Sequence, residues 1–226
     1  MKEAISKKIL FNISEIAALL LWETGAIKVN LDKPFKLVSG NHSPIYINCR
    51  LVLSEPSFMQ LFAAFVKIIS ERNSIHLDVV AGGETAGIPF AAYVAQTQSL
   101  PMVYVRKKPK GHGIASQVEG NINEGQRILL IEDLITDAAS KINFINAIRA
   151  AGGIVEDVLV LFDRLQGGRE SLEEMGVRLH VVTDMEVALT VSKDIDFLSD
   201  DNLKVIREYL QDPIEWHRNR GLIFVD

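Results

Sequence analysis

Short apolar runs alternate with stretches of helical periodicity through most of the chain. The pattern predicts strands over residues 77–81, 102–105, 128–131, 158–162 and 179–182, and helices over 85–96, 141–151, 184–191 and 199–210. Two earlier helices are predicted to begin at Ser14 and Pro56. The strands are apolar throughout, as expected of a sheet buried on both faces. The alternation therefore predicts an α/β fold with a mostly parallel, twisted sheet flanked by helices.

The segment before residue 56 follows a different pattern. Residues 35–38 and 45–47 are short extended runs, and the Gly- and Pro-containing residues 39–44 between them predict a hairpin loop. In the two flanking helices we expect the buried faces to consist of Ile16, Leu19, Leu20 and Trp22, and of Phe58, Leu61, Phe62, Phe65, Ile68 and Ile69.

Composition narrows the class of protein. Of the 226 residues, 48% are hydrophobic and 23% are charged, which is typical of a globular domain rather than a disordered chain. The net charge of −5 gives no general reason to bind nucleic acid. The single cysteine, Cys49, excludes an intrachain disulfide, and no apolar run is long enough to span a membrane. We expect a cytoplasmic protein with neither a nucleic-acid nor a membrane partner.

In open parallel sheets, ligands bind beyond the carboxyl ends of the strands. The strand at 128–131 is followed by Glu132 and Asp133 and then by residues 136–140, Thr-Asp-Ala-Ala-Ser, which lead into a helix. Small and hydroxylated residues at a helix start offer N–H groups to a phosphate, and a carboxylate pair holds sugar hydroxyls or Mg²⁺. The alternative is an ordinary acidic loop in which Ser140 caps the helix. Neither a Walker motif nor a dinucleotide-binding glycine motif is present.

Residues 128–140, Ile-Leu-Leu-Ile-Glu-Asp-Leu-Ile-Thr-Asp-Ala-Ala-Ser, resemble the phosphoribosyl pyrophosphate motif of type I phosphoribosyltransferases. The resemblance implies that Glu132 and Asp133 contact the ribose hydroxyls and that residues 136–140, here the phosphate loop, surround the 5′-phosphate. The substrate-binding set that it implies is Glu132, Asp133, Leu134, Ile135, Thr136, Asp137, Ala138, Ala139 and Ser140, with Thr85 and Ala86. The loop departs from the usual pattern because Ala138 stands where relatives have glycine and Asp137 adds a negative charge.

Residues 106–113, here the lid, concentrate positive charge in an acidic chain. A solvated surface loop is the alternative. The spacing resembles the catalytic loop of orotate phosphoribosyltransferases. That resemblance implies that Arg106, Lys107, Lys110 and His112 act in catalysis by stabilising the departing pyrophosphate, with Asp133 as a further catalytic residue. It also implies a homodimer in which the lid reaches into the neighbouring subunit.

Three other segments are similar to the same family. Residues 35–48 resemble its N-terminal hood, which would place Tyr46 and Ile47 against the orotate ring. Residues 82–89 resemble its pyrophosphate loop, and residues 162–168 resemble the segment whose arginine, here Arg164, pairs with the orotate carboxylate; Thr136 is a further expected orotate contact. Val38 and Ala86 stand where many relatives have lysines.

The resemblance implies one domain over residues 1–226: a hood of about residues 1–55, an α/β core of about 56–195 and a C-terminal helical extension at 196–226. The expected reaction joins orotate to phosphoribosyl pyrophosphate with Mg²⁺ as cofactor, held mainly by substrate and water, so no direct metal ligand is assigned. The rivals are a purine phosphoribosyltransferase and a non-catalytic regulator that senses phosphoribosyl pyrophosphate.

Overall fold

A six-stranded sheet forms the centre of the molecule. The computed structural model describes residues 12–37, 39–109 and 117–225. The strand order is β10-β9-β8-β5-β6-β7, and every neighbouring pair is parallel except β6 and β7. The strands are β5 (Val79–Gly83), β6 (Met102–Val105), β7 (Val118–Glu119), β8 (Arg127–Ile135), β9 (Ile154–Asp163) and β10 (Arg178–Asp184). The predicted α/β fold with a mostly parallel sheet is confirmed.

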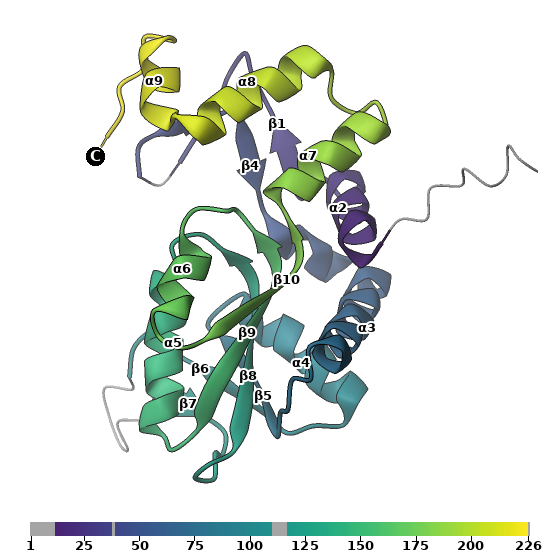
Figure 1. Cartoon of the computed structure of the whole chain (residues 1–226), viewed down its shortest axis with the longest axis vertical. Helices are drawn as coiled ribbons and strands as arrows, with labels where there is room; N and C mark the ends of the chain where they lie inside the picture. Colours follow the sequence, from purple (N-terminus) through teal and green to yellow (C-terminus); the bar gives the residue numbers. More distant parts are fainter. Residues whose placement is uncertain (1–11, 38, 110–116, 226) are drawn as a thin grey trace, which may run out of the picture.

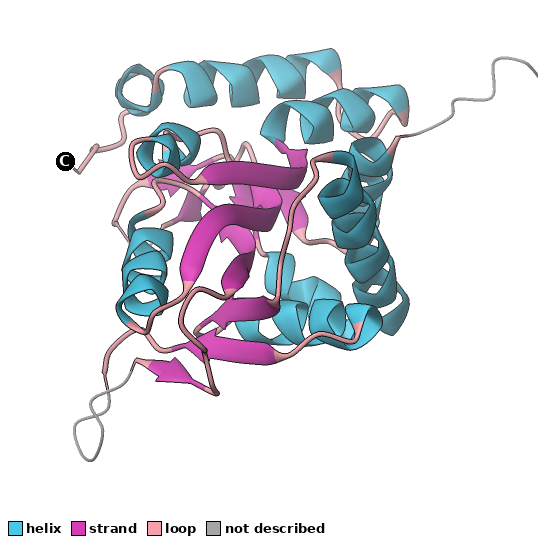
Figure 2. Cartoon of the chain, turned by 60° about the horizontal axis from the view of Figure 1, so that its bottom comes forward, coloured by secondary structure: helices cyan, strands magenta, loops and turns pink. Residues whose placement is uncertain are grey.

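Helices cover both faces of this sheet (Figures 1 and 2). One core cluster joins alternate strand residues such as Leu129 and Leu159 to α2 (Ile13–Glu23), α3 (Pro56–Arg72), α4 (Gly87–Gln98) and α7 (Met185–Asp194). The other joins the intervening strand residues, such as Leu130 and Val158, to α5 (Ala139–Ala150) and α6 (Gly168–Glu173). Side chains of one strand point alternately to the two faces, so both sets must be apolar, and this is why the strands show no alternation in the sequence.

The N-terminal strands form two small antiparallel sheets on the same end of the core sheet as helix α8 (Figure 1). Strand β1 (Ile27–Val29) pairs with β4 (Ile45–Ile47), and β2 (Phe35–Lys36) pairs with β3 (His42–Ser43). The 3-10 helix η1 (Cys49–Ser54) follows. The predicted hairpin loop over residues 39–44 was therefore wrong, because it contains β3, and residues 45–47 pair with β1. Strand β1 was missed because three residues are too few to show a period.

The C-terminal residues return to the hood. Helices α8 (Asp200–Gln211) and α9 (Pro213–Arg218) are followed by a tail that ends against the β2–β3 hairpin. The His42 backbone N–H donates to His217 Nε2 at 2.9 Å, and His217 Nδ1 lies 2.6 Å from the Pro213 carbonyl oxygen. Asn41 exchanges two hydrogen bonds with the backbone of Val225. Through these hydrogen bonds the C-terminal extension holds the β2–β3 hairpin of the hood in place.

The predicted helix faces needed correction. Helix α2 begins at Ile13, because Asn12 and Glu15 form a capping box, and its fully buried side chains are Ala17, Ala18, Leu21 and Trp22. The predicted Ile16, Leu19 and Leu20 are only partly buried. In α3, Phe58, Phe62 and Phe65 are buried as predicted, whereas Ile68 is 36% exposed and Leu61 and Ile69 are partly buried. Small alanines allow close helix approach, so residue size as well as hydrophobicity decided which face turned inward.

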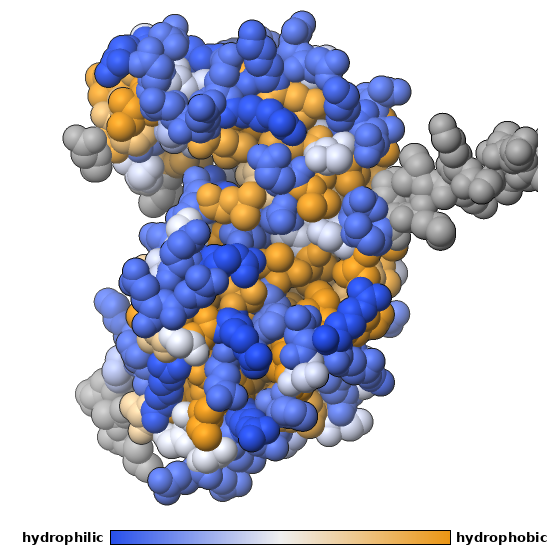
Figure 3. Space-filling view, viewed as in Figure 1, coloured by the Kyte–Doolittle hydropathy of each residue, from blue (hydrophilic) through white to orange (hydrophobic). Residues whose placement is uncertain are grey.

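Within residues 12–37, 39–109 and 117–225, no helix is long and apolar enough to cross a bilayer. Figure 3 shows hydrophilic residues over most of one face, with apolar residues gathered in patches between them.

Candidate active site

Strands β5 and β8 lie side by side at the point where the strand order reverses. The chain continues from β5 to its neighbour β6 on one side and from β8 to its neighbour β9 on the other. The crevice at such a switch point is the usual ligand site of an open parallel sheet. A cavity of about 470 Å³ lies there, lined by Tyr46, Ile47, Asn48, Arg50, Glu84, Thr85, Ala86, Lys107, Glu132, Asp133, Leu134, Ser140, Lys141 and Phe144.

Residues 82–89, here called the pyrophosphate loop after the segment they resemble, enter this cavity at the end of β5. The glycines of this loop are required for space. A Cβ atom on Gly82 would lie 2.6 Å from the Gly87 carbonyl oxygen, and one on Gly87 would lie 2.7 Å from the Ile131 carbonyl oxygen. A Cβ on Gly83 or Gly87 would also collide with Glu132 Oε1. The loop backbone therefore lies directly against the Glu132 carboxylate. Thr85 and Ala86 precede α4, which begins at Gly87 rather than at the predicted residue 85.

The two acids differ in environment. They belong to β8 and not to a loop after Ile131, because ladder pairing with β9 continues to Ile135. The Glu132 side chain is only 6% exposed, and its Oε2 lies 3.2 Å from Lys141 Nζ. The Asp133 side chain is 15% exposed, and its Oδ2 lies 3.8 Å from Arg50 Nε.

Burial raises the pKa of Glu132, and Lys141 opposes that rise. Burial also raises the pKa of Asp133, against the opposing charges of Lys141 and Arg50. The Lys141 ammonium therefore acts on both carboxylates at once. A cavity floor of this kind has a mixed charge and suits a ligand that carries hydroxyls as well as anionic groups.

The phosphate loop is a short turn between β8 and α5. Its helix begins at Ala139, two residues before the predicted start, and Ala138 adopts the left-handed conformation with φ +68°. The Asp137 side chain accepts a hydrogen bond from the Ala139 backbone N–H at 3.1 Å. Ser140 lies inside the helix, so the alternative in which Ser140 caps it is wrong. The N-cap residue is Ala138, which has no side-chain acceptor, and Asp137 binds the Ala139 N–H from the position before it.

Of the lid, the structure describes only its base. The Arg106 backbone N–H donates to the Gln117 carbonyl oxygen at 2.8 Å, and Arg106 Nη1 lies 3.6 Å from Glu119 Oε1 of β7. The Lys107 backbone N–H donates to Glu84 Oε2 at 2.8 Å, and Lys107 lines the cavity while Arg106 does not. Lys110 and His112 lie outside the described residues, as does Val38.

The residues predicted to contact orotate do not all reach the same cavity. Tyr46 and Ile47 line it, and the Tyr46 ring lies 5.6 Å from that of Phe35. Arg164 lines a separate hollow of about 350 Å³ beside α7 and α8. Burial lowers the pKa of Arg164, and its Nε has no hydrogen-bond partner among the described residues. Cys49 lies near both regions. Burial raises the pKa of its thiol, the charge of Asp133 raises that pKa further, and the charge of Arg164 lowers it.

Five predicted contacts of the loop region do not line the cavity: Ile135, Thr136, Asp137, Ala138 and Ala139. The Ile135 side chain is fully buried, so Ile135 can reach a ligand only through its backbone. Thr136 Oγ1 lies 3.5 Å from Asp137 Oδ1.

Comparison with known proteins decides the family. No family model matches the chain. The orotate phosphoribosyltransferase of Sinorhizobium medicae (strain WSM419) is 44% identical over 214 residues, which cover 92% of each protein. The crystal structure of orotate phosphoribosyltransferase from Aeropyrum pernix is 34% identical with a TM-score of 0.69, and the match covers 80% of this chain and 99% of that one. The UMP synthase of Leishmania donovani is 25% identical with a TM-score of 0.75, over 88% of this chain and 42% of that longer one.

The chain belongs to the orotate phosphoribosyltransferase family. The resemblance inferred from its motifs is therefore confirmed, as is the type I phosphoribosyltransferase fold. The roles of individual residues stay predictions.

The sequence motifs of this family member did not identify five residues that line the cavity: Asn48, Arg50, Glu84, Lys141 and Phe144. One signal pointed to Lys141. A cation in the first turn of a helix opposes the helix dipole, so a lysine there calls for a reason. Arg50 gave no such signal, because it follows Cys49 in an irregular segment and only the fold brings it to Asp133.

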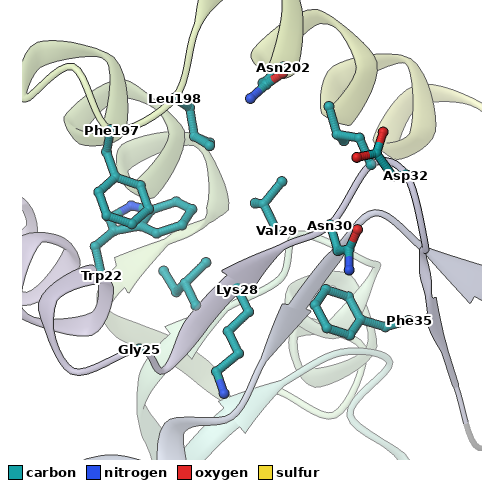
Figure 4. A pocket seen from close by; sticks show the side chains of 12 residues that line it. Trp22, Gly25, Lys28, Val29, Asn30, Asp32, Phe35, Phe197, Leu198 and Asn202 are labelled. Atoms are coloured by element: carbon teal, nitrogen blue, oxygen red, sulfur yellow. The ribbon is translucent and has the colours of Figure 1, made fainter.

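A larger hollow of about 590 Å³ lies between β1 and the start of α8 (Figure 4). Figure 4 shows Trp22 and Phe197 together on one side, with ring centroids 5.0 Å apart. Its charged lining residues are Lys28 and Asp32. It lies at no strand end of the core sheet and contains none of the predicted site residues, so it does not compete as the active site of this phosphoribosyltransferase.

Proposed function

We propose that this chain transfers the phosphoribosyl group from 5-phosphoribosyl 1-pyrophosphate to orotate, giving orotidine 5′-phosphate and pyrophosphate on the route to UMP. One observation carries the proposal: the carboxylates of β8, the pyrophosphate loop, Ser140 and the hood residue Tyr46 line a single cavity at the switch point. Membership of the orotate phosphoribosyltransferase family supports the choice of reaction.

The sugar phosphate would bind along β8 and the start of α5. Asp133, the more exposed of the two acids, would accept hydrogen bonds from the ribose hydroxyls, with Glu132 below it. The backbone N–H groups at the start of α5 and the Thr136 hydroxyl would surround the 5′-phosphate, where the positive end of the helix dipole favours an anion.

The orotate ring would lie against Tyr46 and Ile47 of the hood, and Arg164 would pair with the orotate carboxylate. The partly buried side chain, whose Nε meets no hydrogen-bond partner in the described part of the chain, supports this role, because a ligand carboxylate would supply an acceptor. Arg164 lines the neighbouring hollow rather than the main cavity. The role therefore requires the side chain to turn toward Cys49 when orotate binds. A cationic partner of this kind favours an acidic pyrimidine over the neutral purine bases of the rival activity.

In the reaction, the bond between C1′ and the pyrophosphate oxygen breaks, with its electron pair leaving on pyrophosphate. A bond between orotate N1 and C1′ forms, and the acidic N1 proton passes to solvent. The ribose carbon passes through an oxocarbenium-like state, which nearby carboxylates stabilise, while cations neutralise the departing pyrophosphate. Lys107 lines the cavity. Lys110 and His112 would join it from the lid, and in a homodimer the lid would serve the neighbouring subunit.

Mg²⁺ would bind at this site mainly through the substrate and water, not through a cluster of protein ligands. Among the described residues no group of three or more His, Cys, Asp or Glu side chains could hold a metal ion. Magnesium commonly keeps several waters and binds through one or two carboxylates and substrate oxygens, so Asp133 and the substrate would hold it. When bound, Mg²⁺ would offset negative charge on the pyrophosphate. We further propose a cytoplasmic enzyme.

The test is a spectrophotometric assay of orotate loss with phosphoribosyl pyrophosphate, run with and without Mg²⁺ and repeated with hypoxanthine and adenine. We expect turnover with orotate alone and its loss on chelation of Mg²⁺. Turnover of a purine base in place of orotate would replace this proposal with the purine activity. Binding of phosphoribosyl pyrophosphate without turnover of any base would favour the regulator. Lys110→Ala and His112→Ala should each reduce kcat, and unchanged turnover would contradict the lid assignment.

A further inference from the structure

Lys141 is an unusual residue for its position. It is the third residue of α5, where a cation opposes the helix dipole, and the residue is only 7% exposed. Lysine is rarely buried unless it is paired. An apolar side chain would be expected here, since burial of an ion pair is often no more stabilising than apolar residues of similar volume.

The contacts of Lys141 connect the two anion-binding loops. Its Nζ lies 3.2 Å from Glu132 Oε2 and 3.4 Å from Ser140 Oγ of the phosphate loop. The other oxygen of Glu132 lies against Gly83 and Gly87, which bound the tip of the pyrophosphate loop. One helical turn later, the Phe144 ring contacts the same loop at Gly83. The ammonium therefore lies on the floor of the cavity, next to the place where the pyrophosphate loop opens into it.

The pyrophosphate loop provides no cation of its own. Residues 84–86 supply a carboxylate, a hydroxyl and a methyl group, Glu-Thr-Ala. The described lining of the cavity contains three acids, Glu84, Glu132 and Asp133, and three cations, Arg50, Lys107 and Lys141, so its formal charge is zero. The Arg50 side chain is 61% exposed, and Lys107 lies on an exposed segment. Lys141 is thus the buried cation of this lining.

We propose that Lys141 is a pyrophosphate-binding residue, which exchanges its partner Glu132 for the pyrophosphate group when the substrate binds. This rests on the proposed function. Before substrate binds, the Lys141–Glu132 pair keeps both charges compensated. With substrate present, the ribose hydroxyls engage the acids from above, and the ammonium donates to the anionic oxygens at residues 84–86. A short movement of a flexible side chain accomplishes the exchange, since Ser140, Thr85 and Ala86 line the same cavity.

The proposal predicts a selective loss of affinity. The probes are Mg²⁺–pyrophosphate, which has no sugar, and orotidine 5′-phosphate, which has ribose and 5′-phosphate but no pyrophosphate. In Lys141→Met, titration calorimetry should show pyrophosphate binding weakened about tenfold to a hundredfold, as for loss of a charge-assisted hydrogen bond. Binding of orotidine 5′-phosphate should change by less than about threefold, and KM for phosphoribosyl pyrophosphate should rise with little change in KM for orotate.

A second pair of variants guards against misfolding caused by a lone buried carboxylate. Glu132→Gln removes that charge and leaves an oxygen that still accepts from Lys141, so Glu132→Gln and Glu132→Gln/Lys141→Met differ only in the lysine. Pyrophosphate should bind the single variant well and the double variant about tenfold more weakly. Lys67→Met, on the exposed side of α3, matches the change in net charge and should leave both ligands unaffected.

Equal pyrophosphate affinity in Glu132→Gln and the double variant would overturn the proposal. Equal weakening of pyrophosphate and orotidine 5′-phosphate would also overturn it, because Lys141 would then act through the ribose acids or the 5′-phosphate. Both titrations are independent of turnover. An enzyme that failed to consume orotate would contradict the proposed function and leave the outcome for Lys141 readable by itself.

Discussion

The pyrophosphate loop and the phosphate loop meet at the same cavity but use glycine differently. The pyrophosphate loop has glycine at positions 82, 83 and 87, and a Cβ at each would collide with backbone or with Glu132. The phosphate loop, residues 136–140, has no glycine, although Ala138 adopts a left-handed φ of +68°. The first loop needs glycine for space, and the second needs only an unusual backbone conformation.

This difference indicates which glycines of a site can be replaced by another residue. A non-glycine residue in the left-handed region costs about 1–2 kcal/mol, which a stable domain tolerates. A Cβ that overlaps a carbonyl oxygen requires the backbone itself to move, and at this cavity the backbone positions the reacting groups. A glycine required for space is therefore harder to replace than one required for its φ angle.

The largest expected effect comes from Gly87→Ala. The new Cβ would collide with Glu132 Oε1 and the Ile131 carbonyl oxygen, displacing the acid from Lys141. We expect the free energy of unfolding to fall by about 3 kcal/mol, as for overpacking of a dense interior. We also expect kcat/KM to fall about a hundredfold, as for misplacement of substrate by about 1 Å. Chemical denaturation and steady-state kinetics measure the two quantities. Wild-type kinetics in this variant would show that the loop tolerates a side chain.

Replacement of Asp137 separates the effect of its hydrogen bond to the Ala139 N–H from the effect of its negative charge. Asp137→Ala removes the acceptor for the Ala139 N–H and should lower stability by about 1 kcal/mol. Because it also removes a negative charge beside the phosphate and frees an N–H, KM for phosphoribosyl pyrophosphate should fall severalfold. Asp137→Asn is the matched control, since it keeps an oxygen acceptor without the charge. It should retain the stability and still lower KM; a raised KM in both variants would mean that Asp137 contributes to binding.

Gly125→Ala isolates the effect of φ from the effect of space. Gly125 has φ +80°, and a Cβ there would meet nothing within 4 Å. The residue lies in the turn before β8, at the opposite end of that strand from the acids. We expect a loss of about 1 kcal/mol in the free energy of unfolding and unchanged kinetics. A loss as large as that of Gly87→Ala would remove the distinction between the two kinds of glycine.

The smallest effect, and the opposite sign, is expected for Ala138→Gly. Glycine relieves the left-handed strain, but the unfolded chain gains freedom and a buried methyl group is lost. The net gain in stability should be below about 1 kcal/mol, measured by the shift in Tm. Closer approach of the backbone to the phosphate should lower KM for phosphoribosyl pyrophosphate slightly. A destabilised variant would show that the Ala138 methyl group matters more than its strain.

The sequence predicted the core more reliably than the hood. Core strands such as residues 128–131 are apolar on both faces, so burial alone identifies them. Strand β1 buries Ile27 and leaves Lys28 exposed, and its pairing with β4 depends on residues 16 or more positions away. Likewise, the sequence predicted only a helical extension at residues 196–226, whereas in the structure His217 joins this extension to the hood through the His42 backbone N–H.

By itself the sequence determined the fold class and the family, and it predicted a site at the strand ends, because strand periodicity, loop motifs and the rule for strand ends are local or follow from chain order. Only the tertiary structure decided which charges meet. Lys141 and Glu132 are nine positions apart, on a helix and a strand, and Arg50 reaches Asp133 from an irregular segment. The glycines show the same division. Their positions are known from the sequence, but whether a glycine is required because a Cβ would collide or because its φ is positive depends on the surrounding fold.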